Sequence, residues 1–230
     1  LGQPDLILLP GSKNTMEDLA WLRESGLEAQ ILKAEARGAL IFGICGGYQM
    51  LGETLEDPLG VEAGGSMRGL GLLPLKTTFT GRKTRTRVQG VFAPCEGALN
   101  RLSGRELEGY EIHMGETRVD LRRPESGQTK ALTWVRDQIS GQEKADGAWA
   151  GNVYGTYVHG IFDREDVTEA LIRCLAERKG IFPEILQAAG KGREDRSFRE
   201  FKEQQYDRLA AGIRESLPME QIYKILEQGI

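Results

Sequence analysis

The stretch Gly43-Ile44-Cys45-Gly46-Gly47-Tyr48-Gln49 decides the fold that we expect for this chain. It follows the apolar residues 39–42, so the order predicts a buried strand, a sharp turn and then a helix, with Cys45 at the turn. Open α/β sheets bind ligands at the carboxyl ends of their strands, which makes Cys45 a candidate nucleophile. A helix N-terminus behind the thiol favours the reactive thiolate. The alternative interpretation is a buried structural cysteine in a glycine-rich connection.

Composition limits the possible classes of protein. The chain has 230 residues, 40% of them hydrophobic, and a formal net charge of −4, which suits one large domain or a domain with an appendage. No segment has the composition of a nucleic-acid-binding surface, no apolar run approaches a membrane span, and the N-terminus carries no signal peptide. The three cysteines have neither metal-like spacing nor an even count, so we expect no metal, no disulfide framework and a cytoplasmic location.

The first 44 residues predict a strand-helix-strand unit. The apolar residues 5–9 form its first strand, and a helix capped by Asn14 or Thr15 follows. This helix breaks near Gly26, a second helix stops before the cysteine strand, and the crossover implies parallel pairing. The early strand and the absence of an initiator Met suggest a fragment cut inside a domain. Gly11 and Cys45 then both lie at carboxyl ends of strands. The backbone N–H groups of Gly11 and Gly46 can form an oxyanion hole there, although a plain turn at Gly11 is the alternative.

The middle of the chain changes to a period of two. We expect residues 75–80 and 84–92 to form antiparallel partners joined around Gly81. A third strand at residues 109–115 places Tyr110, Ile112 and Met114 on one face and Glu111 and His113 on the other. Residues 120–148 are polar and glycine-rich, and we expect loops there apart from a strand-like island at 131–135.

The chain contains two histidines, and their settings differ. His159 ends a predicted strand at residues 152–158, before a helix that begins near Arg164, so it has the same topological place as Cys45. This favours His159 as the base of a cysteine–histidine pair, with a structural histidine as the alternative. His113 lies within a strand beside Glu111, and we interpret both as possible accessory residues in substrate binding or scaffolding.

The last part of the chain predicts an amphipathic helical extension. A polar run at 190–196 precedes residues that recur at helical spacing, namely Phe198, Phe201, Gln205, Leu209 and Ile213. We therefore expect an α/β domain at 1–182, with a mainly parallel, partly mixed sheet and helices on both faces. Residues 183–230 form the helical extension, which packs on that sheet or on a neighbouring domain.

Four motifs resemble one family. Residues 43–49 resemble the nucleophile motif of class I (triad) glutamine amidotransferases. Residues 8–15, 109–115 and 154–163 narrow this resemblance to the glutaminase portion of the cobyric acid synthase family. The resemblance covers nearly the whole chain, and it is the C-terminal portion of the family that the chain resembles.

The resemblance implies hydrolysis of glutamine. Cys45 would form a glutamyl thioester, His159 would protonate the departing ammonia, and Gln49 would help hold the substrate. Ammonia would pass to an N-terminal synthetase domain that this chain lacks, where ATP and Mg²⁺ activate carboxylates of a corrinoid substrate. The chain itself carries no cofactor, and no glycine-rich phosphate loop with Lys and Ser/Thr occurs in it.

One position departs from the class. Class I enzymes usually place a glutamate two residues beyond the histidine, and this chain has an apolar residue there. Glu111 and Asp163 are candidates to orient the imidazole instead, and otherwise the site works as a dyad. The related cobyrinic acid a,c-diamide synthase, another ammonia-donating subunit and a non-catalytic docking domain remain alternatives.

Overall fold

The computed structural model describes residues 1–120, 127–181 and 198–228. The chain forms two compact units, Leu1–Ile185 and Leu186–Ile230, and each is described here by itself. The boundary that we predict, between residues 182 and 183, lies outside the described residues, as does the polar run at 190–196.

A four-stranded sheet carries the cysteine strand. Its strands in spatial order are β1 (Leu6–Leu9), β2 (Leu40–Ile44), β10 (Val153–Thr156) and β9 (Ala148–Ala150). The first three are parallel, and β9 runs antiparallel to β10. The predicted parallel pairing of the first strand with the cysteine strand is confirmed, with Leu6 opposite Leu40.

Two helices connect β1 to β2 as expected. They are α1 (Thr15–Glu24) and α2 (Leu27–Ala36). The side chain of Asn14 caps α1 by accepting a hydrogen bond from the backbone N–H of Glu17 at 3.2 Å. Gly26 has a φ of 74°, a left-handed conformation that glycine adopts without strain, and it separates the two helices.

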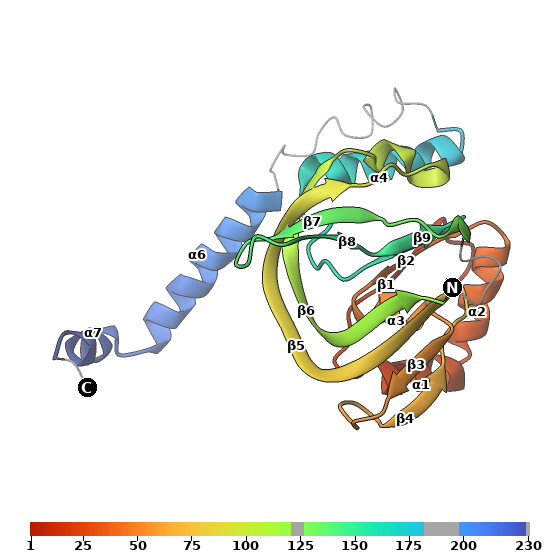
Figure 1. Ribbon diagram of the computed structural model, residues 1–230. Coiled ribbons are helices and arrows are strands. Elements are labelled where there is room, and N and C mark those ends of the chain that lie inside the picture. The colour runs from red at the N-terminus through yellow and green to blue at the C-terminus, as the bar shows by residue number, and fades with distance from the viewer. Residues whose placement is uncertain (121–126, 182–197, 229–230) are drawn as a thin grey trace. The chain divides into compact units, whose positions relative to one another are not determined.

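Helices cover both faces of this sheet, because β2 alternates its side chains between two cores. Leu40 and Phe42 pack in one core with Leu171 of α4 (Glu165–Arg178) and with η1 (Gly97–Leu102). Ile41 packs in the other core with Leu19 of α1 and with a residue of α2. Figure 1 shows α4 and α1–α2 on opposite sides of the strands. The predicted mixed α/β class with helices on both faces is therefore confirmed.

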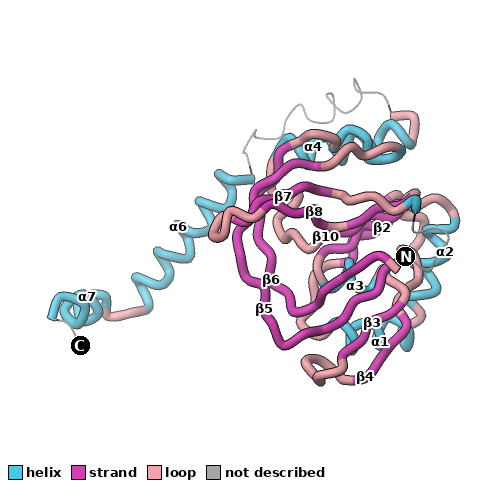
Figure 2. Tube along the Cα trace, in the orientation of Figure 1, coloured by secondary structure: helices cyan, strands magenta, loops and turns pink. Residues whose placement is uncertain are grey.

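A second sheet contains six strands and is mostly antiparallel. They are β4 (Gly65–Arg68), β3 (Thr54–Asp57), β5 (Leu75–Phe92), β7 (Thr133–Asp137) and β8 (Glu143–Asp146), with β6 (Glu106–Val119) also paired to β5. The pairing of β3 with β5 is parallel, and all its other pairs are antiparallel. The long curved β5 runs beside β6 along most of its length (Figures 1 and 2).

The predicted hairpin around Gly81 is wrong. Residues 75–92 form one continuous strand, and both of its halves pair with β6. Gly81 does not adopt the positive φ that tight hairpin turns require. The pairing register shifts between Phe79 and Thr84 instead, so the glycine marks an irregularity within a strand and not a turn.

Residues 127–148 are also more regular than expected. The predicted island is present as β7, but β8 and the start of β9 occupy residues that we interpreted as loop. Strand β8 lies at an exposed sheet edge, where charged residues are common. Its charged residues therefore gave no strand pattern in the sequence. The histidine strand ends at Thr156, so His159 lies in the turn that precedes α4 and not at the end of the strand.

The described residues of the second unit, 198–228, form two helices, α6 (Phe198–Ser216) and α7 (Met219–Gln228). The predicted helical extension is thus present in the described residues. Several large apolar side chains of these helices are exposed, among them Leu209 and Leu226.

Candidate active site

Cys45 occupies a strained turn between β2 and the short helix α3 (Gly46–Met50). Its φ of 53° and ψ of −107° are unusual, and it is the one non-glycine residue in the described part of the chain with a positive φ. Such a conformation costs about 1–3 kcal/mol and persists when the surrounding structure imposes it. Turns of this kind hold a nucleophile at the end of a strand, which is where residues 43–49 led us to expect Cys45.

The loop after β1 packs directly against this turn. The backbone N–H of Gly47 donates to the carbonyl oxygen of Pro10 at 3.0 Å. A methyl carbon built on Gly46 would lie 2.7 Å from Cβ of Ser12, closer than van der Waals contact allows. A side chain at position 46 would therefore push the two loops apart, and the two predicted oxyanion donors belong to adjoining segments.

Gly11 brings the predicted nucleophile and base together. A methyl carbon built on Gly11 would lie 2.8 Å from Cε1 of His159, 3.6 Å from its Nδ1 and 3.7 Å from Cβ of Cys45. Cys45 and His159 thus approach one point beside Gly11 from two different turns, one after β2 and one after β10. Topology alone predicted this convergence at one sheet edge.

Tyr110 of β6 contacts both the backbone and the ring of His159. The N–H of His159 donates to the carbonyl of Tyr110 at 2.8 Å, and the N–H of Tyr110 donates back at 3.2 Å. The two rings stack with centroids 4.9 Å apart and an angle of 5° between their planes. The sequence did not predict this contact of Tyr110, because the two residues are far apart in the chain and no local sequence pattern indicates that they meet.

Burial sets the protonation of the pair. It raises the pKa of the Cys45 thiol to about 11, although the backbone N–H of Gly46 lowers it. Burial also lowers the pKa of His159, and His113 lowers it further. The N-terminus of α3, which we expected to favour the thiolate, does not offset this burial, because α3 has only five residues. The Cys45 thiol instead donates to the carbonyl of Ile112, with 3.5 Å between Sγ and the oxygen.

Gln49 lies in a buried polar network beneath Cys45. Its Oε1 accepts from the hydroxyl of Thr15 at 2.9 Å, and its Nε2 donates to the Tyr157 hydroxyl at 3.2 Å. The Thr15 hydroxyl also lies 3.2 Å from Oε1 of Glu62. These bonds fix Gln49 against α1, and its contact with substrate remains a prediction.

The accessory residues Glu111 and His113 lie on the face of β6 opposite Tyr110. Glu111 is fully buried and forms an ion pair with Lys144, with 2.7 Å between Oε2 and Nζ. Nε2 of His113 lies 3.8 Å from the same oxygen, and its ring stacks on Tyr157. The third candidate, Asp163, donates its backbone N–H to Gly160 in the turn after His159. The ring of His159 stacks on Tyr110, as described above.

The sequence matches the family of CobB/CobQ-like glutamine amidotransferase domains over residues 1–167. The chain belongs to this family. Its glutamine amidotransferase domain therefore carries Gly11, Cys45 and His159, the three residues that meet at one point.

Curated relatives of this glutamine amidotransferase chain are longer proteins. It is 50% identical over its full length to a cobyric acid synthase of Ruminiclostridium cellulolyticum and 47% identical over 99% of its length to one of Lachnoclostridium phytofermentans. It spans 43% and 44% of those proteins, less than half of their length. A solved structure of PurLQS from Thermotoga maritima is 19% identical, with a TM-score of 0.49 over 76% of this chain and 82% of that chain.

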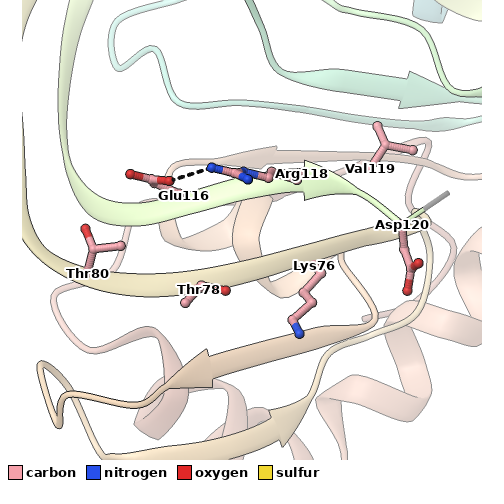
Figure 3. Close-up of a pocket in the computed structure, with 7 residues that line it drawn as sticks. All are labelled: Lys76, Thr78, Thr80, Glu116, Arg118, Val119 and Asp120. Atoms are coloured by element: carbon pink, nitrogen blue, oxygen red, sulfur yellow. Dashed lines mark hydrogen bonds and ion pairs between the residues drawn. The ribbon is translucent and has the colours of Figure 1, made fainter.

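A surface hollow of the amidotransferase domain lies away from the residues of this site. It measures about 500 Å³ and is lined by outward-facing side chains of β5 and β6 (Figure 3). Lys76 in its wall pairs with Glu56, and Arg118 pairs with Glu116. Because these charges are neutralised within the protein, we assign the hollow no role in catalysis.

The described residues of the amidotransferase chain offer no group of three or more His, Cys, Asp or Glu side chains that could hold a metal ion. Among the same residues, no helix is both long enough and apolar enough to cross a bilayer.

Proposed function

We propose that this chain is the glutaminase portion of a cobyric acid synthase and supplies ammonia for amidation. The observation that carries the proposal is the meeting of Cys45 and His159 beside Gly11, which places a nucleophile, a base and a backbone donor around one small volume. The whole-length similarity to cobyric acid synthases supports the choice of reaction.

The first half of the reaction forms a thioester. Burial favours the protonated thiol of Cys45 and the neutral imidazole of His159 before substrate arrives. The sulfur therefore attacks the amide carbon of glutamine as its proton passes to His159. The carbonyl oxygen becomes an oxyanion, which the N–H groups of Gly11 and Gly46 stabilise. His159 then returns the proton to the departing nitrogen, and ammonia leaves.

The second half regenerates the enzyme. His159 takes a proton from water as the water oxygen attacks the glutamyl thioester, and the same N–H groups stabilise the second oxyanion. Collapse of this intermediate breaks the carbon–sulfur bond, releases glutamate and returns the proton to Cys45. Gln49 holds the substrate in this scheme, from a position fixed by Thr15 and Tyr157.

The amidation itself belongs to the synthetase portion of the longer protein. There, ATP with Mg²⁺ would activate four carboxylates of adenosylcobyrinic acid a,c-diamide, and the ammonia would convert them to amides to give cobyric acid. Neither group fits the described residues of this chain, which lack a metal-ligating cluster and a phosphate loop, so no step here passes through them. All three cysteines are free thiols, which supports a reducing cytoplasmic setting.

Replacement of Cys45 by serine in the full-length enzyme tests the proposal. A hydroxyl has a much higher pKa than a thiol, so glutamine-dependent amidation falls by several orders of magnitude. Amidation driven by added ammonium salt persists, because free ammonia bypasses the thioester. If Cys45→Ser abolishes the ammonium-driven reaction while the protein stays folded, Cys45 is not a dedicated glutaminase nucleophile.

A further inference from the structure

The setting of His159 raises the question of what orients its ring. In cysteine and serine triads a carboxylate bonds to the imidazole, which fixes its orientation and raises its pKa. Here the pKa of His159 is lowered, first by burial and then by His113, which is the opposite direction. Glu111 points to the other face of β6, where it pairs with Lys144.

Tyr110 contacts both the ring and the backbone of His159. Its ring lies parallel to the imidazole at 4.9 Å, and reciprocal backbone hydrogen bonds fix the two residues opposite each other. Gly109, the preceding residue, approaches the carbonyl oxygen of His159 so closely that a Cβ there would collide with it. The distance between β6 and the turn that holds His159 is therefore set by the backbone, and the Tyr110 ring covers one face of the imidazole.

Gly11 limits the rotation of the imidazole at the ring edge that carries Cε1. Cε1 of His159 faces Gly11, where a methyl carbon would already be too close at 2.8 Å. A ring that is covered on one face and confined at one edge has few orientations open to it. Without the tyrosine ring, solvent would replace the stacked face and the imidazole could rotate away from Cys45.

We propose that Tyr110 is a positioning residue that holds the His159 imidazole toward Cys45 by ring stacking. This inference rests on the proposed glutaminase function. The aromatic ring is the active feature, since the stacked contact needs a flat face and no hydroxyl bond.

The test uses the full-length enzyme and three variants. Tyr110→Thr removes the ring and keeps a residue that favours strands, and Tyr110→Phe keeps the ring without the hydroxyl. Glu108→Thr is the matched control, because Glu108 is an exposed residue two positions earlier on the same face of β6. Glutamine hydrolysis is measured as kcat and KM over a range of pH, and ammonium-driven amidation checks that the synthetase portion is intact.

We expect Tyr110→Thr to lower kcat for glutamine on the order of 10²-fold, as misplaced catalytic groups do, with KM unchanged. The acid limb of its kcat/KM profile moves to higher pH, because His159 becomes more hydrated. Tyr110→Phe and Glu108→Thr keep the wild-type kcat and pH profile. If Tyr110→Thr is unfolded by thermal melting, Tyr110→Leu, which keeps apolar cover without a flat ring, is measured in its place.

Two results overturn the inference while leaving the proposed function intact. One is a wild-type kcat in the variant without the ring, and the other is an equal loss in Tyr110→Phe, which would assign the effect to the hydroxyl. Absence of glutamine hydrolysis in the wild-type enzyme overturns the proposed function together with this inference.

Discussion

Substitution of Gly11 by alanine adds one methyl group at the point where the site is most crowded. The new carbon would lie 2.8 Å from Cε1 of His159, whereas carbon atoms in contact are about 3.5–4.0 Å apart. The imidazole or the loop must therefore move by roughly 1 Å, which costs on the order of 10²-fold in a positioned reaction. Alanine keeps the backbone N–H, so this loss measures displacement of His159 and not loss of an oxyanion donor.

The assay compares glutamine-dependent and ammonium-driven amidation in the full-length enzyme. Gly11→Ala lowers kcat for glutamine on the order of 10²-fold and leaves the ammonium-driven rate unchanged. Overpacking destabilises the fold by about 1–3 kcal/mol, measured by urea denaturation. Gly212→Ala in α6 is the control, since a methyl group there meets no atom within 4 Å. A Gly11→Ala enzyme with wild-type kcat and KM would refute the packing of Gly11 against His159.

Two further predictions follow from burial and charge. We expect the rate of alkylation of Cys45 by iodoacetamide to rise with pH toward about 11, because burial raises the pKa of the thiol to that value. The rate is measured by mass spectrometry of the peptide that contains Cys45. A plateau near neutral pH would instead indicate a thiolate–imidazolium pair. Lys144→Met removes the closest ionic partner of the buried Glu111 carboxylate and destabilises the fold by about 1–3 kcal/mol at pH 7. Burial alone would raise the pKa of Glu111, but His113 and Lys144 lower it overall. Its stabilisation is therefore present above the unfolded pKa and lost as pH falls through the folded one, and the effect of Lys144→Met shrinks on acidification. Arg136→Met, which breaks the exposed pair with Glu143, changes stability by about 0–1 kcal/mol, and an equal loss in both variants would contradict the role of burial.

The sequence predicts the cysteine half of the site well, because its signals are local. Apolar runs mark β1 and β2, Asn14 caps α1, and the glycines around Cys45 mark the turn. Parallel pairing then follows from the length of the crossover and places Gly11 beside Cys45.

The second sheet is harder to predict, because its pairing is decided by contacts distant in sequence. The two halves of β5 have the alternation of a hairpin, and only their shared partner β6 makes them one strand. The alternation of β6 was predictable, but not which face is buried. Glu111 is inside with Lys144 as its partner, while Tyr110 is 46% exposed and available to stack on His159.

The backbone bridge between Tyr110 and His159 joins β6 of the six-stranded sheet to the turn that follows β10 of the four-stranded sheet. Along this seam the two backbone hydrogen bonds of the bridge lie beside a side-chain contact of 2.6 Å between the hydroxyl groups of Thr117 and Tyr157. A local opening of the seam would move His159 without unfolding either sheet. Turnover would then scale with the fraction of molecules in which the seam is closed. Hydrogen exchange at the backbone amides of Tyr110 and His159 would report that fraction directly.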